Sequence, residues 1–415
     1  MQTELAENRI DADVLRAHFA EVRSMTMSLT EPFSTEDQML QSMPEASPVK
    51  WHLAHTTWFF ETFILVPYSR KYRPFHRIFQ YLFNSYYKQL GGHPYRGARG
   101  LMSRPALEQV HAYRKHVDQS MMEFLQQPEA EALNLVELGL NHEQQHQELI
   151  LTDIKHALWS GPLRPDLIDQ AEQGSSPKLA WLDLEGAIYS IGNEGEGFAF
   201  DNESPRHEIL LRPFQIASRL VTNGEYLEFM NDGGYSRPEL WLSEGWDTVN
   251  AQNWNSPLYW DCQDGEWRQF VMNGMKRVNL AEPLCHVSFF EADAYARWAG
   301  ARLPLESEWE VAATRYPARG TLLEDGIWQP QPARGDGLQQ VFGDVWEWTA
   351  SPYVAYPGFS PAAGAIGEYN GKFMCNQFVL RGGSCATPGS HIRASYRNFF
   401  PPQARWQFSG LRLAK

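Results

Sequence analysis

The chain has 415 residues and carries 50 Asp and Glu against 36 Lys and Arg, which gives a formal net charge of −14. Because nucleic-acid binding depends on Lys and Arg that neutralise phosphates, this balance argues against a nucleic-acid partner. The apolar runs are far shorter than the ~18 residues of a membrane span, and residues 1–7 lack a basic-then-apolar signal pattern, so we expect a cytoplasmic protein with no membrane partner.

Composition divides the chain into two parts. Residues 1–160 read as long amphipathic helices with few glycines, whereas residues 181–415 are rich in Gly, Trp and Asn and in short strand-like runs. Between them, residues 161–180 contain the Gly and Pro clusters that are typical of a connector. The length also exceeds that of one ordinary core. We therefore predict an α+β multidomain protein with a helical domain over 1–160, a linker over 161–180 and a mixed domain over 181–415.

The first two predicted helices are residues 11–29 and a helix that begins near Pro48. Ser47 can cap the second helix, and Pro48 suits its first position because a backbone N–H would be unpaired there anyway. On this helix His55 lies in line with Trp and Phe side chains. Burial of a polar ring on such a face requires a partner. His52, one helical step around, is a competing candidate that the apolar register favours less.

The segment 81–101, which follows this helix, reads as a Gly-rich surface loop. Its Arg96 and Arg99 could bind a substrate carboxylate in a bidentate manner, or they could simply be solvated. Tyr86 and Tyr87 are either packing residues or proton donors beside a site.

Residues 141–148, Asn-His-Glu-Gln-Gln-His-Gln-Glu, form the most informative stretch of the chain. The apolar spacing around it predicts a helix, on which His142 and His146 share one face because they are four residues apart. Helical bundles build metal sites from inward-facing residues of neighbouring helices, so His55 is the candidate third ligand. Three imidazoles leave open coordination positions and suit zinc, copper or non-haem iron, and the spacing does not choose among these metals.

The same stretch fits the His-Glu-x-x-His pattern of zinc proteases, in which Glu143 would be the general base. Such proteases need a third ligand downstream, and the candidates Glu148, Asp153 and His156 fit no standard extension of the pattern. A zinc-dependent hydrolase is therefore the alternative function of a different class.

Several short elements are expected in the C-terminal part. Residues 187–192 alternate like a strand, and a short helix begins at Thr222 or Asn223. Another helix runs over 288–300 and is closed by Gly300. The four cysteines are widely spaced, so neither a thiolate zinc site nor a disulfide scaffold is expected.

Four ordered blocks then carry a resemblance to a known family. They are Arg-Leu-Pro-Leu-Glu-Ser-Glu-Trp-Glu at 302–310, Gly-Asp-Val-Trp-Glu-Trp-Thr at 343–349, Leu-Arg-Gly-Gly-Ser at 380–384 and Phe-Ser-Gly-Leu-Arg at 408–412. The blocks resemble the signature of formylglycine-generating-enzyme-like domains, which implies a loop-rich mixed fold related to C-type lectins. The copper-binding cysteine pair of the formylglycine-generating enzymes is missing, because Cys385 stands alone after the third block, so their activity is not expected.

Ahead of this domain, the helices that carry His55 and His142 to His146 resemble a DinB-like four-helix bundle with metal-binding histidines. The two parts in this order resemble the iron-dependent sulfoxide synthases of ergothioneine biosynthesis. The resemblance implies an Fe(II)-dependent oxidoreductase that uses O2 to join the sulfur of cysteine or γ-glutamylcysteine to C2 of the hercynine imidazole, leaving a sulfoxide. Selenoneine- or ovothiol-type synthesis on a related substrate is the alternative within this class, and the oligomeric state stays open.

The resemblance also implies roles for individual residues, taken position by position. The three iron ligands are His55, His142 and His146. Gln145 matches a glutamine that contacts the hercynine imidazole. Tyr86 and Tyr87 match tyrosines of one branch of the family, where a phenol near the O2 site serves in proton transfer.

Residues 393–402 resemble the C-terminal loop that closes over hercynine, with Asn398 as the candidate contact. Phe399 and Phe400 stand where another branch carries Trp-Asp. Their aromatic faces can bind the trimethylammonium cation of hercynine, or the two rings simply pack. The carboxylate of the sulfur donor has three candidate partners, Arg96, Arg99 and Arg405.

Overall fold

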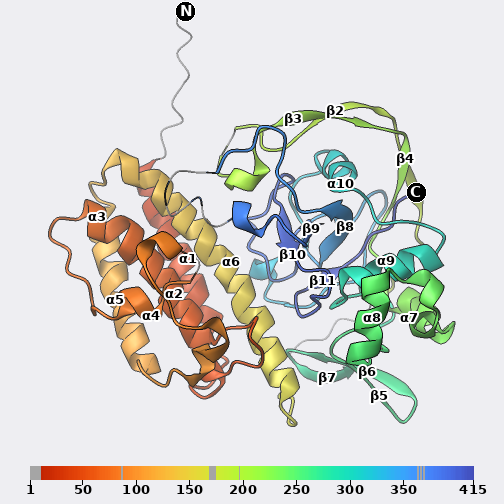
Figure 1. The fold of residues 1–415 in the computed structure, drawn as a ribbon, viewed down its shortest axis with the longest axis horizontal. Helices are drawn as coiled ribbons and strands as arrows, with labels where there is room; N and C mark the ends of the chain where they lie inside the picture. Colours follow the sequence, from red (N-terminus) through yellow and green to blue (C-terminus); the bar gives the residue numbers. More distant parts are fainter. Residues whose placement is uncertain are drawn as a thin grey trace, which may run out of the picture. The chain divides into compact units, whose positions relative to one another are not determined.

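The computed structural model describes residues 11–85, 87–167, 174–195, 197–361, 364, 367 and 370–415. The chain divides into two compact units, Met1–Ala157 and Leu158–Lys415. The first is helical and the second combines helices with small sheets (Figure 1), which confirms the predicted α+β multidomain class. The division falls within helix α6 (Ala130–Ser160), ahead of the segment 161–180 that the sequence predicts as the linker.

Four long helices make up most of the first unit, coloured from red to yellow in Figure 1. They are α1 (Ala12–Ser28), α2 (Val49–Phe60), α5 (Leu107–Phe124) and α6, and the short helices α3 (Val66–Tyr68) and α4 (Phe79–Leu82) lie between α2 and α5 in the chain. A π-helical turn, Glu61–Leu65, continues α2. Asp11 begins α1, because its carboxylate accepts the backbone N–H groups of Asp13 and Val14.

Every residue of α2 is buried. The predicted cap by Ser47 is wrong, because Pro48 is the residue before the helix and no side chain of the described residues caps it. Ser47 instead donates its N–H to Asp153 Oδ2 at 2.7 Å and accepts a hydrogen bond from Arg99 at 2.8 Å. The first of these bonds ties the start of α2 to α6.

Gly139 lets α6 approach α2 closely. A Cβ atom here would lie 2.7 Å from Phe60 Cε1 and 2.9 Å from Phe59 Cε1, well inside normal carbon contact. We expect Gly139→Ala to lower the free energy of unfolding by about 1–3 kcal/mol, as overpacking of a core does. Denaturant unfolding measures the change. Gly92→Ala is the matched control, since its Cβ would lie 3.5 Å from Tyr81; equal stability of the two variants would contradict the prediction.

The described residues of the second unit form four small sheets. The largest has the strand order β10-β9-β8-β11, with β8 at Trp346–Pro352, β9 at Phe378–Arg381, β10 at Asn398–Phe400 and β11 at Ser409–Gly410. Its pairs are antiparallel except for β11, which runs parallel to β8. The other sheets pair β1 (Trp181–Leu184) with β4 (Phe214–Ala217), β2 (Ala187–Ile191) with β3 (His207–Leu211), and β6 (Glu266–Val271) with both β5 (Trp260–Gln263) and β7 (Gly274–Arg277).

The helices of the second unit are α7 (Asn223–Asn231), α8 (Ser243–Gln252), α9 (Phe289–Trp298) and α10 (Glu306–Ala313). Thr222 caps α7 and Ser288 caps α9 by reciprocal hydrogen bonds with the glutamate three residues further on. The predicted helix start at Thr222 is therefore confirmed, as is the predicted strand over 187–192, which is β2.

The four sequence blocks meet in this unit through two buried ion pairs. Arg381 of the third block lies 2.7 Å from Glu310 of the first, and Arg412 of the fourth lies 2.8 Å from Glu347 of the second. Removing one partner of such a pair typically costs about 3–5 kcal/mol, because the other charge is left buried and uncompensated. The blocks are therefore the framework of the second unit, which is why their pattern predicts its fold.

Asp344, in the second block, is buried, and burial raises the pKa of its carboxyl from 3.8 to about 7. The folded state thus favours the protonated acid, and the resulting stabilisation is complete below pH 3.8 and is lost as the pH rises to about 7. Over about three pH units this loss is at most ~4 kcal/mol.

We expect Asp344→Asn to raise the free energy of unfolding at pH 8 and to change it little at pH 4. The amide oxygen can still accept the backbone N–H of Gln331, now 2.8 Å from Asp344 Oδ1, and the φ of 57° suits asparagine. Urea unfolding at the two pH values measures the difference. The same change in stability at both would contradict the assignment.

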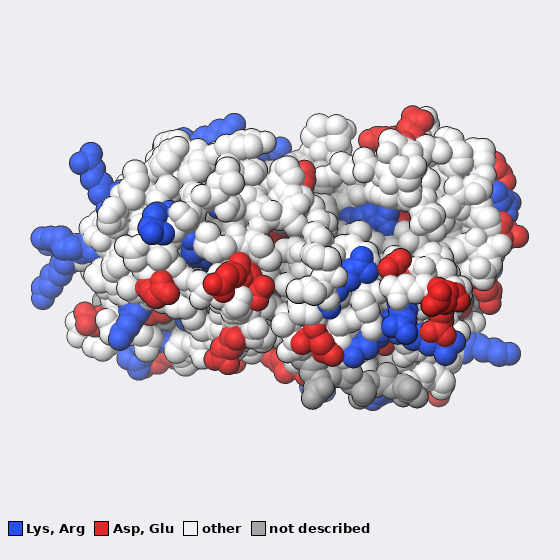
Figure 2. All heavy atoms as spheres, turned by 90° about the horizontal axis from the view of Figure 1, so that it is seen from below, with Lys and Arg blue, Asp and Glu red and all other residues white. Residues whose placement is uncertain are grey.

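The surface of the described residues is mixed in charge on the face that Figure 2 draws, where Lys and Arg are interspersed with Asp and Glu. This arrangement differs from the continuous basic stripe that follows a phosphate backbone. Among the described helices, none combines the length and the apolarity that a bilayer crossing requires.

Candidate metal centre

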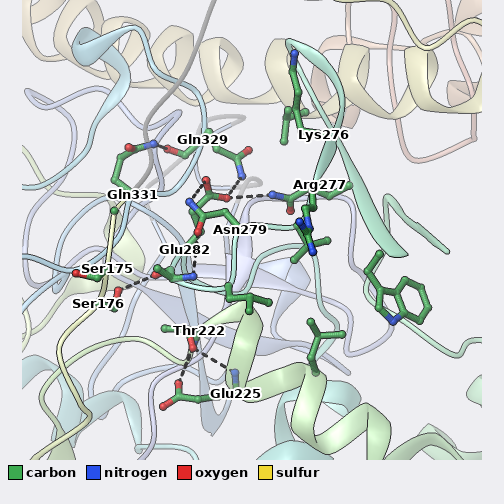
Figure 3. A pocket seen from close by; sticks show the side chains of 18 of the residues that line it. Ser175, Ser176, Thr222, Glu225, Lys276, Arg277, Asn279, Glu282, Gln329 and Gln331 are labelled. Carbon is green, nitrogen blue, oxygen red and sulfur yellow. Dashed lines mark hydrogen bonds between the residues drawn. The ribbon is translucent and has the colours of Figure 1, made fainter. Parts of the chain in front are cut away.

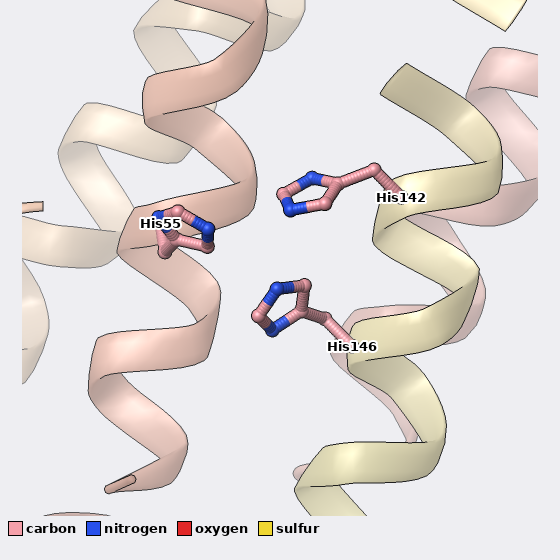
Figure 4. A group of neighbouring side chains, drawn as sticks. All are labelled: His55, His142 and His146. Carbon is pink, nitrogen blue, oxygen red and sulfur yellow. The ribbon is translucent and has the colours of Figure 1, made fainter. Parts of the chain in front are cut away.

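Three buried histidines from two helices converge inside the first unit. His55 lies on α2, and His142 and His146 lie one turn apart on α6. One side-chain nitrogen from each ring lies within 4.8 Å of those of the other two. Figure 4 shows the three rings pointing toward one another. The structure therefore brings together the three residues that the sequence predicts as ligands.

The His55 ring is held on both faces and at one edge. It stacks on Trp51 with ring centroids 4.5 Å apart and on Trp58 with centroids 5.5 Å apart. Its Nδ1 lies 2.6 Å from the carbonyl oxygen of Phe83, which only accepts hydrogen bonds, so Nδ1 carries the proton. In the neutral ring Nε2 is then unprotonated and available to a metal ion.

The two histidines of α6 differ in their surroundings. His146 Nδ1 lies 2.7 Å from Nδ1 of His52, the competing candidate on α2, which is not a member of the group of three. His142 Nδ1 is buried and has no hydrogen-bond partner among the described residues. Buried polar atoms are almost always paired, so the His142 ring fits a site that is completed by a ligand that the chain itself does not supply.

All three rings are neutral near pH 7. Burial lowers the pKa of His142 to about 4. Burial, together with repulsion from His142, holds the pKa of His55 and the pKa of His146 well below the ordinary value. Neutral imidazole is the form that binds metals, and three such nitrogens leave coordination positions open. The donor set therefore fits zinc, copper or non-haem iron.

Glu143, the general base of the hydrolase alternative, is fully buried in an ion-pair network. Its carboxylate accepts hydrogen bonds from Arg23 at 2.8 Å, from Thr26 at 2.7 Å and from Arg114 at 2.5 Å. Burial by itself would raise the pKa of Glu143, but Arg114 and Arg23 outweigh it and lower the pKa to about 2. A carboxylate held in this way does not take up a proton near pH 7, which argues against the zinc-protease alternative.

Other polar residues of α6 lie near the three histidines in the chain. Gln145, the predicted hercynine contact, directly precedes His146 and is half-buried. Asp153 Oδ2 lies 3.1 Å from His52 Nε2, and His156 Nδ1 bonds the Ser42 hydroxyl at 2.7 Å. Glu148 is half-buried. None of these residues belongs to the group of three among the described residues.

Arg99 corrects the prediction of a surface loop over 81–101. It is buried, in a 3-10 turn formed by Arg96–Leu101. Its guanidinium donates to the hydroxyls of Ser47 at 2.8 Å and Ser85 at 2.9 Å, and it lies 3.4 Å from the ring centre of Trp51. Because Trp51 stacks on the candidate ligand His55, Arg99 supports the wall of the site.

The other candidates from this segment occupy different environments. Arg96 is half-buried and donates to the carbonyl oxygen of Glu45. Tyr87 is buried and packs on Trp58, with ring centroids 5.6 Å apart, and Trp58 in turn stacks on His55. Tyr86 lies outside the described residues.

The predicted C-terminal contacts lie in the second unit. Asn398, Phe399 and Phe400 form the edge strand β10, and all three are half-buried. Phe399 stacks on Tyr353 with ring centroids 4.1 Å apart, so at least one face of this ring is used in packing. The Asn398 side chain accepts the backbone N–H of Phe399 at 2.9 Å.

Arg405 is engaged inside the second unit. It is buried, lies 3.4 Å from the carboxylate of Glu291, and covers the ring of Trp254 at 4.2 Å from its centre. It also donates to the carbonyl oxygen of Ser256. A guanidinium with these partners is a weaker candidate for a substrate carboxylate than the sequence suggests.

The second unit also contains a cavity of about 1170 Å³ (Figure 3). On its wall, the carboxylate of Glu282 accepts hydrogen bonds from three amides, those of Gln269, Gln329 and Asn279. Arg219 pairs with Glu225 at 2.8 Å, and Arg277 pairs with Glu266 at 3.3 Å. The charged groups of the cavity thus largely satisfy one another, and none of the site residues predicted from the sequence lines it.

The sequence analysis missed the carbonyl of Phe83, which is a backbone group for which a side-chain pattern gives no signal. Trp51 and Trp58 belong to the Trp and Phe side chains that the helical pattern places in line with His55, because they lie four residues before it and three after it. The structure confirms that both rings stack on His55.

A helical unit with a buried three-histidine centre, followed by a loop-rich α+β unit, defines a candidate two-unit metalloprotein. Residues 166–331 and 328–415 match the family model described as "Sulfatase-modifying factor enzyme 1-like domain". The hercynine oxygenase of Mycobacterium tuberculosis is 30% identical over 448 residues, covering 96% of this chain and 98% of that protein.

Two further relatives cover smaller parts. The hercynine oxygenase of Mycolicibacterium smegmatis is 35% identical over 307 residues, 67% of this chain and 70% of that protein. The formylglycine-generating enzyme of Streptomyces coelicolor is 30% identical over 250 residues, 48% of this chain and 77% of that protein. The chain belongs to the hercynine oxygenase family, with a sulfatase-modifying factor enzyme 1-like domain as its C-terminal part.

Proposed function

We propose that this protein uses Fe(II) and O2 to join the sulfur of cysteine or γ-glutamylcysteine to C2 of the hercynine imidazole, leaving a sulfoxide. The observation that carries the proposal is a buried three-histidine centre in a chain that matches a hercynine oxygenase over nearly its whole length. The reaction balances, because the C2–H and S–H hydrogens leave in water with one atom of O2 while the other oxygen atom enters the sulfoxide.

His55, His142 and His146 would hold the iron through neutral ring nitrogens. The iron supplies the chemistry with O2, for which protein side chains alone are unsuited. Three protein ligands would leave coordination positions open to the substrates, and the chain would contribute by holding the thiol and the imidazole in one orientation.

The residues proposed to contact hercynine are Gln145, Asn398, Phe399 and Phe400. Gln145 is proposed for the imidazole, because it adjoins His146 on α6 and is only half-buried. A trimethylammonium group has no proton to donate, and aromatic faces attract such a cation. Phe399 and Phe400 are proposed for this group, with Asn398 beside them on β10.

The carboxylate of the sulfur donor is proposed to bind Arg96. Arg99 already donates to two serine hydroxyls, and Arg405 already faces Glu291. Arg96 is half-buried, and it donates a hydrogen bond to the carbonyl oxygen of Glu45. A guanidinium that is partly exposed to solvent can bind an incoming carboxylate in a bidentate manner.

Tyr87 is the proposed proton donor, and Tyr87→Phe tests that role. We expect unchanged iron content, because the phenol is not part of the three-nitrogen group, and less sulfoxide formed per O2 consumed, because the proton source is lost. Metal analysis and product masses measure the two effects. The exposed Tyr95 provides the control Tyr95→Phe. An unchanged product ratio in Tyr87→Phe would rule out proton transfer by this phenol.

The function itself is tested by reconstituting the protein with Fe(II) without air and then admitting O2 with hercynine and either thiol. We expect a hercynyl sulfoxide adduct with at least one of them, detected by its mass. If hercynine persists but histidine or a selenium donor reacts, the ovothiol- or selenoneine-type alternative replaces the proposal. No O2-dependent product with any of these substrates would refute the whole class.

A further inference from the structure

We propose that His52 and Asp153 form a hydrogen-bonded relay that positions His146 as a metal ligand, an inference that rests on the proposed function of the three-histidine centre. His52 Nδ1 lies 2.7 Å from His146 Nδ1, and His52 Nε2 lies 3.1 Å from Asp153 Oδ2. All three side chains are buried. His52 is thus a positioning residue rather than a ligand.

Helix geometry accounts for the arrangement. Asp153 follows His146 by seven residues, which is two turns of α6, so both side chains lie on one face of that helix. His52 reaches between them from α2, three residues before the candidate ligand His55. The backbone N–H of Ser47 donates to the same Asp153 oxygen at 2.7 Å, which holds the carboxylate in place.

The order of donors along the relay determines the position of each proton. A carboxylate oxygen only accepts, so His52 Nε2 carries a proton and donates it to Asp153. In neutral His52 the Nδ1 atom is then an acceptor, and His146 must donate to it from its own Nδ1. His146 Nε2 is therefore the unprotonated atom, and it is the atom offered to the metal.

His55 has the same tautomer as His146, but a different partner fixes it. Its Nδ1 donates to the carbonyl oxygen of Phe83, which again leaves Nε2 as the ligand atom. Partners of this kind fix the tautomer and the orientation of a ligating imidazole, and losing one typically weakens metal binding about 10–100-fold. His55 and His146 thus have hydrogen-bond partners of different kinds, which are a backbone carbonyl for His55 and a histidine–carboxylate pair for His146.

Metal affinity of the full-length, metal-free protein tests the relay. Co(II) is titrated without air or substrate into the wild type, His52→Leu and His52→Asn, and the melting temperature of each metal-free protein is recorded. We expect the dissociation constant of His52→Leu to rise about 10–100-fold. His52→Asn should bind more tightly than His52→Leu, because its side-chain oxygen can accept the Nδ1–H of His146.

The matched control is His156→Asn. His156 is a hydrogen-bonded histidine on the same helix, bonded to Ser42 and outside the relay, and its replacement should leave Co(II) affinity unchanged. If His52→Leu fails to fold, His52→Asn alone decides, since it should still bind measurably more weakly than the wild type because it loses the bond to Asp153. Wild-type affinity in both His52 variants would overturn the relay.

A second readout responds to the relay and not to folding alone. In the Co(II)-loaded protein, the Nδ1–H protons of His55 and His146 give shifted, exchangeable NMR signals. We expect the His146 signal to exchange faster with solvent in His52→Leu, while the His55 signal, held by Phe83, is unchanged. Equal exchange in the wild type and the variant would contradict the proton assignment.

The same titration separates failure of the relay from failure of the proposed function. If the wild type binds Co(II) and His142→Ala does not, the three-histidine metal centre is supported, and the His52 variants then test the relay alone. If the wild type binds no Co(II), both the metal centre and the relay are contradicted.

Discussion

His142→Ala should abolish stoichiometric binding of Fe(II) and, with it, all O2-dependent activity. The substitution leaves two imidazoles where the structure places three within ligand distance of one another. We expect the affinity for Fe(II) to fall more than about 100-fold, beyond the 10–100-fold loss that removal of a ligand's outer partner typically causes. Iron content after anaerobic reconstitution and gel filtration measures the effect.

The fold of this variant should be retained. His142 Nδ1 is buried without a partner among the described residues, so removing the ring from the metal-free protein removes an unsatisfied polar group. His111→Ala, a histidine of the same unit outside the group of three, is the control for iron content. Iron bound by His142→Ala at the wild-type level would show that the ligand assignment is wrong.

Glu143→Gln should destabilise the protein strongly while leaving metal binding intact. The carboxylate is the shared partner of Arg23 and Arg114, and both guanidinium groups are buried. Neutralising it leaves two buried cations without their common counter-ion, for which we expect a loss of about 3–5 kcal/mol in the free energy of unfolding. Denaturant unfolding measures the loss.

The same variant decides between the two classes of function. Glu148→Gln, on the same helix and half-buried, is the control and should stay within about 1 kcal/mol of the wild type. In a zinc hydrolase, Glu143→Gln would instead keep its stability and lose a hydrolytic activity. Wild-type stability of Glu143→Gln would therefore contradict the structural role of this carboxylate.

The sequence predicted the three histidines from helix periodicity, from the apolar register of the helix that carries His55, and from the family resemblance. His142 and His146 are one turn apart, and His55 belongs to the apolar register of a second helix that must pack inward. The four C-terminal blocks predicted the fold for a related reason, since their charged residues supply both members of the two buried ion pairs.

The partners of the histidines could not be predicted in this way. The proposed positioning role of His52 depends on its hydrogen bond to Asp153, which lies 101 residues further along the chain. Only the packing of α2 against α6 brings these two residues together. Arg99 lies among Gly residues that are typical of a surface loop, yet it is buried. Its guanidinium stacks on Trp51 and donates hydrogen bonds to two serine hydroxyls. Such contacts depend on tertiary structure, for which local pattern has no signal.

The most direct test of the central claim is O2 uptake by the reconstituted protein with hercynine and a thiol present. We expect uptake that requires Fe(II), hercynine and the thiol together, is absent when Zn(II) replaces Fe(II), and is absent in His142→Ala. The amount of O2 consumed should equal the amount of sulfoxide formed. O2 uptake that is independent of hercynine, or hercynine left unchanged by the Fe(II)-loaded protein, would contradict the account.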